Sequence, residues 1–302
     1  MVPSRYTTIE LDSHGTTLRG RLYLPTRIPA PVVVMAHGFS ATIPMVLDRY
    51  AEAFQAAGVA ALAFDLPGLG ASDGEPRGEI NPWVSARAYR SAVDWASRHE
   101  LLDPERIALW GDSLSSRVAL VVTSVDDRVR ALVCQVPAMG RELLDASGGA
   151  HVAIATLVRD GQVRGEPSSW LRMPVVSSDQ VDAPSALEPL TAFRWFIEYG
   201  GRYGTGWSNR VVLTVGDLPA VFDPAACAPQ VQVPTLFVMS PDDEMPGANS
   251  QVARAVFDRL GGPAELVEVD GGHFGIVEHP SAEFDRASAV EAAFLVRVLA
   301  GS

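Results

Sequence analysis

One serine lies where a strand is expected to turn directly into a helix. The stretch Leu109–Ser115 (LWGDSLS) predicts this tight turn, which can hold the Ser113 hydroxyl exposed above a sheet as a nucleophile. The residues two before and two after such a serine must be small, because the strand and helix backbones nearly touch there. Gly111 meets this requirement, and Ser115 is a mild departure from the usual glycine. Taken alone, the pattern also fits Ser113 as the N-cap residue of the helix.

A second stretch supplies groups that would stabilise negative charge. Met35–Phe39 (MAHGF) ends an apolar run, and the backbone N–H that follows the His-Gly pair would face the nucleophile. Together with the N–H of Leu114, the N–H of Phe39 would bind the oxyanion of a tetrahedral intermediate. We interpret His37 as a structural residue that organises this loop through its ring nitrogens, rather than as a catalytic group.

A serine nucleophile needs a general base, and His273 has the best position among the six histidines. It lies in Asp270–Phe274 (DGGHF), a loop after the last predicted strand, so we expect it at the carboxyl edge of the sheet above Ser113. The alternative interpretation is a histidine on a surface loop. The other five histidines have less suitable positions: His14, His37, His99, His151 and His279.

The base in turn needs an acid that orients it. Pro241–Pro246 (PDDEMP) follows a predicted strand, and an aspartate there can accept the Nδ1 proton of His273, which leaves Nε2 free to deprotonate Ser113. We favour Asp243 because D-x-x-P is the usual shape of this turn. Three other acidic residues nearby are weaker candidates: Asp242, Glu244 and Asp270.

Two other chemistries are excluded. Asp112 does not fit as the nucleophile, because the bulky Trp110 would then occupy the position that must be small. The glycine-rich run Pro67–Gly74 (PGLGASDG) resembles a phosphate-binding loop but has no lysine. All 24 basic residues of the chain are in fact arginine, which also excludes Schiff-base and pyridoxal phosphate chemistry.

The segments that carry these residues alternate between short apolar runs and longer amphipathic stretches. A hairpin is predicted at Thr7–Ser13 and Leu18–Pro25, followed by strands at Pro31–Gly38, Val59–Pro67, Arg106–Asp112, Arg130–Pro137, Thr235–Ser240 and Ala264–Asp270. Helices are predicted at Pro44–Ala57, Asn81–Leu101, Leu114–Thr123, Gln251–Leu260 and Ser281–Leu299. The alternation predicts an α/β fold with a doubly wound, mostly parallel sheet and helices on both faces.

One stretch, residues 138–231, interrupts this alternation. Its 94 residues are far longer than an ordinary crossover between two strands. We interpret it as an inserted helical cap over a ligand crevice, with residues 1–137 and 232–302 forming the core. We expect most of its clustered aromatic residues to form the core of the cap, and one or two to line a pocket. This cluster comprises Phe193, Trp195, Phe196, Tyr199, Tyr203 and Trp207.

The composition indicates a folded chain with no affinity for nucleic acid or membranes. Of the 302 residues, 47% are hydrophobic, and the formal net charge of −12 repels phosphate backbones and anionic lipid. No 18-residue apolar run occurs and Met1–Leu11 has no apolar leader, so we expect a cytoplasmic protein. Cys134 and Cys227 lie in no CxxC pair or zinc-binding pattern, so we expect reduced thiols and no metal or organic cofactor.

The motifs together resemble those of serine hydrolases with the α/β-hydrolase fold. The resemblance spans nearly the whole chain and rests on five segments: His37–Phe39 (HGF), Phe64–Gly74 (FDLPGLGASDG), Leu109–Ser115, Val233–Pro246 (VPTLFVMSPDDEMP) and Gly271–Phe274 (GGHF). Within that superfamily the chain is similar to the dienelactone hydrolase and X-Pro dipeptidyl-peptidase-like branch. Val133–Pro137 (VCQVP) makes it similar to polyketide transferase-like hydrolases as well.

This resemblance implies roles for individual residues. Ser113 would be the nucleophile, His273 the base and Asp243 its partner. Along the chain they stand in the order Ser113, Asp243, His273, which is the order expected for this family. Phe39 and Leu114 would donate to the oxyanion. A further acidic residue, in the FDLPG motif, would be part of the scaffold: Asp65.

We therefore expect a serine hydrolase that cleaves an ester, lactone or thioester of a small-molecule acyl substrate through an acyl-enzyme. An acyltransferase or cyclase of natural-product biosynthesis is the alternative, in which the same residues pass the acyl group to an alcohol or amine. A peptidase is less favoured because nothing marks a pocket for an N-terminal amine. A non-enzymatic binding module is less favoured because all three triad positions are filled. The sequence leaves the oligomeric state open and is compatible with a homodimer.

Overall fold

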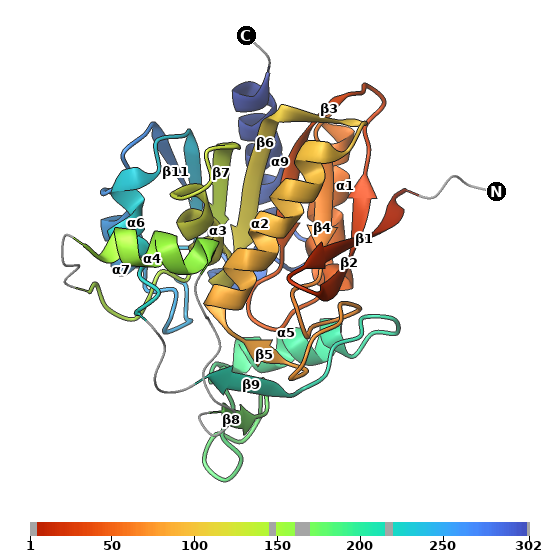
Figure 1. The fold of residues 1–302 in the computed structure, drawn as a ribbon. Helices are drawn as coiled ribbons and strands as arrows, with labels where there is room; N and C mark the ends of the chain where they lie inside the picture. The colour runs from red at the N-terminus through yellow and green to blue at the C-terminus, as the bar shows by residue number, and fades with distance from the viewer. Residues whose placement is uncertain (1–4, 145–148, 161–169, 215–219, 301–302) are drawn as a thin grey trace.

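The computed structural model in Figure 1 describes residues 5–144, 149–160, 170–214 and 220–300. The strands of its main sheet are β1 (Thr7–Ser13), β2 (Thr16–Tyr23), β3 (Ala30–Ala36), β4 (Ala60–Phe64), β6 (Leu102–Asp112), β7 (Val129–Gln135), β10 (Thr235–Met239) and β11 (Ala264–Glu268). A smaller sheet contains β5 (Glu79–Ile80), β8 (Trp170–Met173) and β9 (Val211–Thr214). The helices are α1 (Asp48–Ala56), α2 (Pro82–Arg98), α3 (Leu114–Thr123), α4 (Ala150–Arg159), α5 (Leu190–Gly200), α6 (Pro224–Cys227), α7 (Ser250–Phe257), α8 (Gly272–Gly275) and α9 (Ala282–Leu299), with short turns η1 (Ile43–Leu47) and η3 (Ala228–Gln230).

The main sheet is mostly parallel. Its strand order within the described ranges is β1-β2-β4-β3-β6-β7-β10-β11. The pairs β1–β2 and β2–β4 are antiparallel, and all later neighbours are parallel. In Figure 1, α2 and α3 lie in front of the sheet, whereas α1 and α9 lie behind it. The predicted α/β fold with helices on both faces is therefore confirmed.

The strand β3 shows why the sheet requires apolar runs. Val32 and Val34 point into the cluster that also contains residues of α2 and α3, whereas Val33 and Met35 point into the cluster of α1 and α9. All four side chains are fully buried. Since successive side chains of a strand alternate between faces, a strand covered on both sides has no position for a solvated polar residue.

The helix expected at Pro44–Ala57 begins later than the sequence pattern indicated. Its first part is the irregular turn η1, in which Val46 has φ +80°, and α1 starts only at Asp48. The carbonyl of Met45 lies 2.7 Å from Nε2 of the buried His37 ring. The predicted start of the helix was wrong because Met45 and Val46 have non-helical backbone angles, and the Met45 carbonyl contacts a buried side chain eight residues earlier.

The segment 138–231 is only partly helical. It contains the antiparallel strands β8 and β9, which join β5 in the smaller sheet. Helix α5 packs against η1 and α8, whereas α4 packs against α2 and α6 against α3. In Figure 1, α5 and the small sheet lie together, well apart from α4. The segment predicted as a helical cap thus contains two strands as well as helices, and the proposed bounds of the cap stay a prediction.

Candidate active site

Ser113 lies between the end of β6 and the start of α3 in a strained backbone conformation. Its φ of +50° and ψ of −119° are rare for a residue with a side chain, and its N–H donates to the carbonyl of Gln135 at 2.9 Å. A Cβ at Gly111 would overlap the backbone carbonyl of Ser115. The sequence-based requirement for a small residue two positions before the serine is confirmed.

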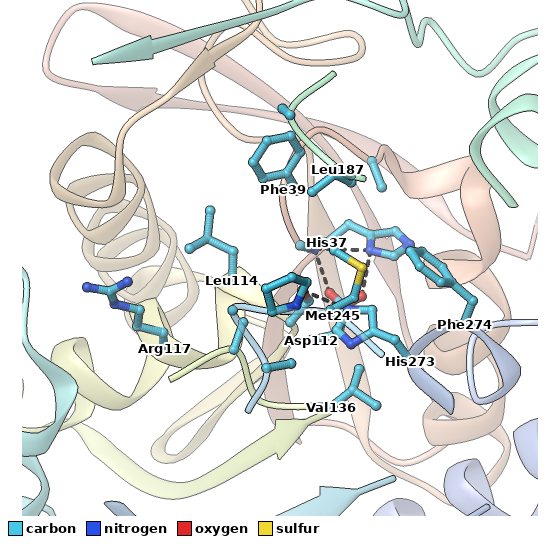
Figure 2. A pocket seen from close by; sticks show the side chains of 18 of the residues that line it. His37, Phe39, Asp112, Leu114, Arg117, Val136, Leu187, Met245, His273 and Phe274 are labelled. Carbon is cyan, nitrogen blue, oxygen red and sulfur yellow. Dashed lines mark hydrogen bonds and ion pairs between the residues drawn. The ribbon is translucent and has the colours of Figure 1, made fainter. Parts of the chain in front are cut away.

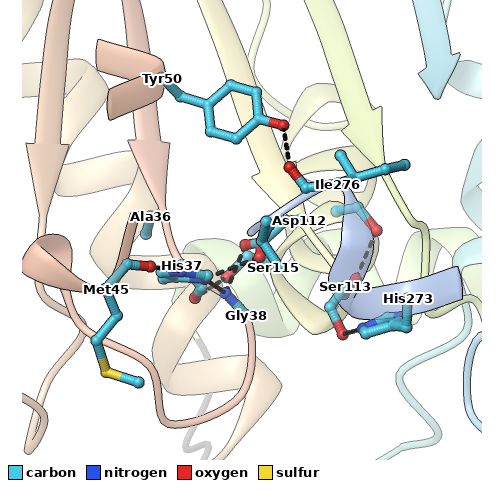
Figure 3. A network of polar contacts seen from close by, with 12 residues as sticks. Ala36, His37, Gly38, Met45, Tyr50, Asp112, Ser113, Ser115, His273 and Ile276 are labelled. Atoms are coloured by element: carbon cyan, nitrogen blue, oxygen red, sulfur yellow. Dashed lines mark hydrogen bonds and ion pairs between the residues drawn. The ribbon is translucent and has the colours of Figure 1, made fainter. Parts of the chain in front are cut away.

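The structure brings Ser113, His273 and Asp243 together in one line of hydrogen bonds. Ser113 Oγ lies 2.9 Å from His273 Nε2, as Figure 3 shows, and His273 Nδ1 lies 2.7 Å from Asp243 Oδ2. The side chains of His273 and Asp243 are only 5% and 3% exposed. This geometry fits a tautomer with the proton on Nδ1 and the Nε2 lone pair directed at the serine hydroxyl.

The other acidic residues of this turn contact backbone rather than the imidazole. Asp242 Oδ1 accepts from the N–H of Gly272 at 3.1 Å and from Ser240 Oγ at 2.8 Å, and these bonds lower the pKa of Asp242. Glu244 Oε2 accepts from the N–H of His273 at 2.8 Å. The stretch 242–244 therefore holds the α8 turn as well as the histidine ring.

Glu244 is also a link to the inserted segment that the sequence analysis missed. Its Oε1 accepts a hydrogen bond from the hydroxyl of Thr191, in the first turn of α5. Glu244 thus contacts the backbone of His273 with one oxygen and α5 with the other. No local sequence signal marks this arrangement, because the residues it joins are distant in the chain.

The backbone N–H groups of Phe39 and Leu114 lie at the same cavity. Both residues line it, and neither amide has a hydrogen-bond acceptor in the part of the chain that the structure describes. Phe39 has φ +43°, which turns the chain immediately after Gly38. A Cβ at Gly38 would lie 2.7 Å from both the Asp112 carbonyl oxygen and Ser113 Cβ. The glycine therefore allows the loop to approach the serine closely.

His37 forms a buried ion pair behind this loop. Its Nδ1 lies 2.8 Å from Asp112 Oδ2, and its Nε2 lies 2.7 Å from the Met45 carbonyl oxygen (Figure 3). These two acceptors favour an imidazole that carries a proton on each ring nitrogen. Burial would lower the pKa of His37, but the charge and hydrogen bond of Asp112 outweigh it and raise the pKa. Asp112 also accepts from the N–H of Gly38 at 2.6 Å.

A cavity of about 380 Å³ opens above these groups. Figure 2 shows it between His273 and Phe274 on one side and Leu114 on the other, with a largely apolar lining. Trp195 and Phe196 of α5 contribute to the lining, whereas Tyr203 is fully exposed. The expectation that one or two aromatic residues of the inserted segment reach the pocket is thus met by this pair.

The remaining expectations concern metals, thiols and membranes. Across the described ranges, no group of three or more His, Cys, Asp or Glu side chains is placed to hold a metal ion. Cys134 and Cys227 are both buried and not joined to each other, and burial raises the pKa of Cys227 to about 12. None of the helices in these ranges has the length and apolarity needed to cross a membrane.

The chain belongs to the alpha/beta hydrolase family, whose family model matches residues 33–287. A thiohydrolase, apmlB of Arthrinium phaeospermum, is 28% identical over 94% of this chain and 94% of its own length. A polyketide transferase, af380 of Aspergillus fumigatus, is 28% identical over 89% of this chain and 90% of its own length.

Solved structures confirm the same fold. The alpha/beta hydrolase GrgF from a Penicillium species superposes with a TM-score of 0.77 at 23% identity, covering 98% of this chain and 99% of its own. A dienelactone hydrolase from Anabaena variabilis has a TM-score of 0.58 at 15% identity, covering 97% of each chain. The resemblances inferred from the motifs are therefore confirmed at the level of family and fold.

Proposed function

We propose that this protein hydrolyses a carboxylic ester, lactone or thioester of a small molecule through an acyl-enzyme on Ser113. The observation that carries the proposal is the line of hydrogen bonds from Ser113 through His273 to Asp243. The alternative role of Ser113 as an N-cap residue does not explain this geometry, because its side chain accepts no hydrogen bond from a helix N–H. Its strained backbone instead places Oγ 2.9 Å from a buried imidazole, as a nucleophile requires. The thiohydrolase among the relatives supports a thioester as one substrate.

In the first half of the reaction, Ser113 Oγ attacks the carbonyl carbon and its proton moves to His273 Nε2. The negative oxygen that forms lies between the N–H groups of Phe39 and Leu114. Asp243 stabilises the imidazolium that results. The carbon–oxygen or carbon–sulfur bond then breaks, and the leaving alcohol or thiol takes the proton from His273.

In the second half, water attacks the acyl-enzyme and gives its proton to His273. The ester bond to Ser113 breaks, the serine regains the proton, and a carboxylic acid is released. No atom or electron from a cofactor is needed in either half.

The test is fluorophosphonate labelling, read by intact mass, alongside hydrolysis of a series of p-nitrophenyl acyl esters. We expect one adduct on the wild-type chain, turnover of at least one ester, and loss of both in Ser113→Ala. Ser124→Ala is a matched control, because Ser124 lies at the opposite end of α3 and its Oγ donates to the Val121 carbonyl. An unlabelled but folded wild-type chain would contradict the proposal.

An acyl transfer or cyclisation is the second candidate. The apolar lining of the cavity favours it, because an acyl-enzyme shielded from water survives until another nucleophile arrives. The polyketide transferase among the relatives supports it as well. Product analysis with and without an added alcohol or amine distinguishes the two candidates: the free acid as the sole product in both cases supports hydrolysis.

A further inference from the structure

Arg117 is a charged residue at the cavity that the proposed mechanism does not use. It lies on α3 four residues after Ser113, and therefore one turn further along the same side of the helix. Figure 2 shows it beyond Leu114, at the end of the cavity away from His273. It also lines a neighbouring hollow of about 200 Å³. The guanidinium therefore stands where the cavity continues away from the reacting groups.

The positive charge of Arg117 lacks an ion-pair partner. Its guanidinium donates one hydrogen bond to the carbonyl of Phe222, and Cζ lies 5.6 Å from the centroid of that ring. Within the described ranges, no carboxylate oxygen lies within 4.0 Å of its nitrogens, and its Nε is buried without a hydrogen-bond partner. The buried carboxylate of Asp223 attracts it only from a greater distance, and Asp223 Oδ1 accepts from the N–H of Ala225 at 2.9 Å.

A guanidinium without a counter-ion is unfavourable in a cavity that is empty or that holds a wholly apolar ligand. Arg117 is half-buried, and taking a guanidinium partly out of water without a counter-ion costs free energy, which is also why desolvation lowers the pKa of Arg117. The buried carboxylate at the cavity, Asp112, is already paired with His37. An arginine presents several N–H donors in a planar fork, which matches the oxygens of a carboxylate or phosphate.

We propose that Arg117 binds a carboxylate or phosphate of the substrate, so that the enzyme selects acyl compounds that carry an anion away from the reacting carbonyl. This inference rests on the function proposed for Ser113. With a net charge of −12 on the chain, an anionic substrate needs such a local positive group to offset the surrounding potential. The anion has two sources: the far end of the acyl chain, or a phosphate on the leaving thiol.

Two pairs of matched substrates distinguish these sources. The first pair is the p-nitrophenyl monoester of glutaric acid and its neutral terminal amide, which differ only in the charge at the end of the acyl chain. The second pair is an acyl thioester of coenzyme A and the same acyl thioester of N-acetylcysteamine, which lacks phosphate. We expect kcat/KM of the wild-type enzyme to favour the anionic member of one pair by about tenfold or more.

The variant Arg117→Gln should bring that ratio close to one, because a glutamine keeps polar volume but not charge. Arg141→Gln is the matched control, since Arg141 lines the same cavity but is exposed, so it should change the ratio much less. Arg117→Lys should give an intermediate ratio, because lysine keeps the charge without the fork. A drop in kcat/KM that is equal for both members of each pair would mean that Arg117 is only structural, which overturns the proposal.

Inhibition of the wild-type enzyme keeps the test decisive if the variants fold poorly. If the anion belongs to the acyl chain, glutarate should inhibit hydrolysis of p-nitrophenyl acetate competitively and at lower concentration than the uncharged glutaramide. If the anion belongs to the leaving thiol, coenzyme A should inhibit the same reaction at lower concentration than N-acetylcysteamine. Equal inhibition within both pairs, together with substrate ratios near one, would overturn the inference while leaving the proposed hydrolysis intact. Failure of every ester and thioester, with no labelling of Ser113, would instead contradict the proposed function.

Discussion

Ser115 donates a hydrogen bond from its Oγ to the main-chain carbonyl of His37 at 2.7 Å. This bond joins the first turn of α3, which carries Leu114, to the loop that carries Phe39. The two candidate oxyanion donors come from segments far apart in the chain, and Ser115 connects them. The serine at position 115, where glycine is usual, therefore has a physical reason. Its side chain is small enough to fit and carries a hydroxyl that connects the two segments.

Ser115→Ala should lower kcat for ester hydrolysis by about tenfold, because a misplaced oxyanion donor stabilises the transition state less. The loss of one buried hydrogen bond should also reduce the free energy of unfolding by about 1 kcal/mol. Steady-state kinetics and urea denaturation measure the two effects. A variant with wild-type kcat would show that this connection does not position the donors.

Asp243→Asn should lower kcat by roughly 10³- to 10⁴-fold, because an amide can hold His273 in the wrong tautomer. The matched control is Asp242→Asn, whose carboxylate accepts from Ser240 Oγ and from the N–H of Gly272. An asparagine oxygen can still accept those bonds, so we expect less than about a tenfold loss. The reverse order of effects, measured on one ester, would assign the orienting acid to Asp242.

Gly38→Ala should impair both folding and labelling of Ser113. The new methyl group would lie 2.7 Å from Ser113 Cβ and the Asp112 carbonyl oxygen, so the loop must move away from the serine. We expect a loss of about 1–3 kcal/mol in the free energy of unfolding and a fluorophosphonate labelling rate reduced by more than tenfold. Gly149→Ala, where a methyl group meets no heavy atom within 4 Å, is the control: it should leave the labelling rate unchanged and cost less than about 1 kcal/mol as the N-cap residue of α4.

The His37–Asp112 pair should make stability fall as the pH rises above 6.5. The pKa of His37 is raised above its ordinary value of 6.5, so between the two values the folded chain binds more protons than the unfolded chain. The stabilisation is fully present below pH 6.5 and is lost as the pH passes the folded-state pKa. His37→Gln should remove this part of the pH dependence, measured by urea denaturation at several pH values.

A second histidine provides the matched control for this experiment. His14→Gln makes the same substitution at an exposed position in the turn between β1 and β2. Wild-type and His37→Gln curves that stay parallel between pH 6 and 9 would show that the imidazole of His37 does not titrate differently in the folded state.

Glu291→Gln should stabilise the protein at neutral pH. Glu291 on α9 is fully buried, its Oε2 accepts from Trp110 Nε1 at 2.9 Å, and its Oε1 has no partner in the described ranges. Burial raises the pKa of Glu291 well above its ordinary value, so its contribution to stability is present in acid and is lost as the pH rises. A neutral glutamine avoids that loss.

The melting temperature of Glu291→Gln should therefore exceed that of the wild-type chain at pH 8, with the difference shrinking toward pH 4. Asp285→Asn is the matched control, because it neutralises an exposed carboxylate on the same helix. A lower melting temperature for Glu291→Gln at pH 8 would indicate a buried carboxylate that the fold stabilises in its charged form.

The sequence by itself determined the sheet, the elements on both sides of it and the order Ser113, Asp243, His273. Buried parallel strands and amphipathic helices impose periodic patterns that are readable within a dozen residues. The turn around Ser113 was predictable for a similar reason, since the close approach of strand and helix restricts residues two positions away.

Only the tertiary structure places Asp243 Oδ2 2.7 Å from His273 Nδ1 and directs Asp242 and Glu244 to backbone N–H groups of the α8 turn, because these contacts join segments about 30 residues apart. It also decided the pairing of His37 with Asp112, the strands β8 and β9, and the position of Arg117 at the cavity. Each of these depends on contacts between residues tens or hundreds of positions apart. Local propensity carries no information about such contacts, which form only when the whole core packs.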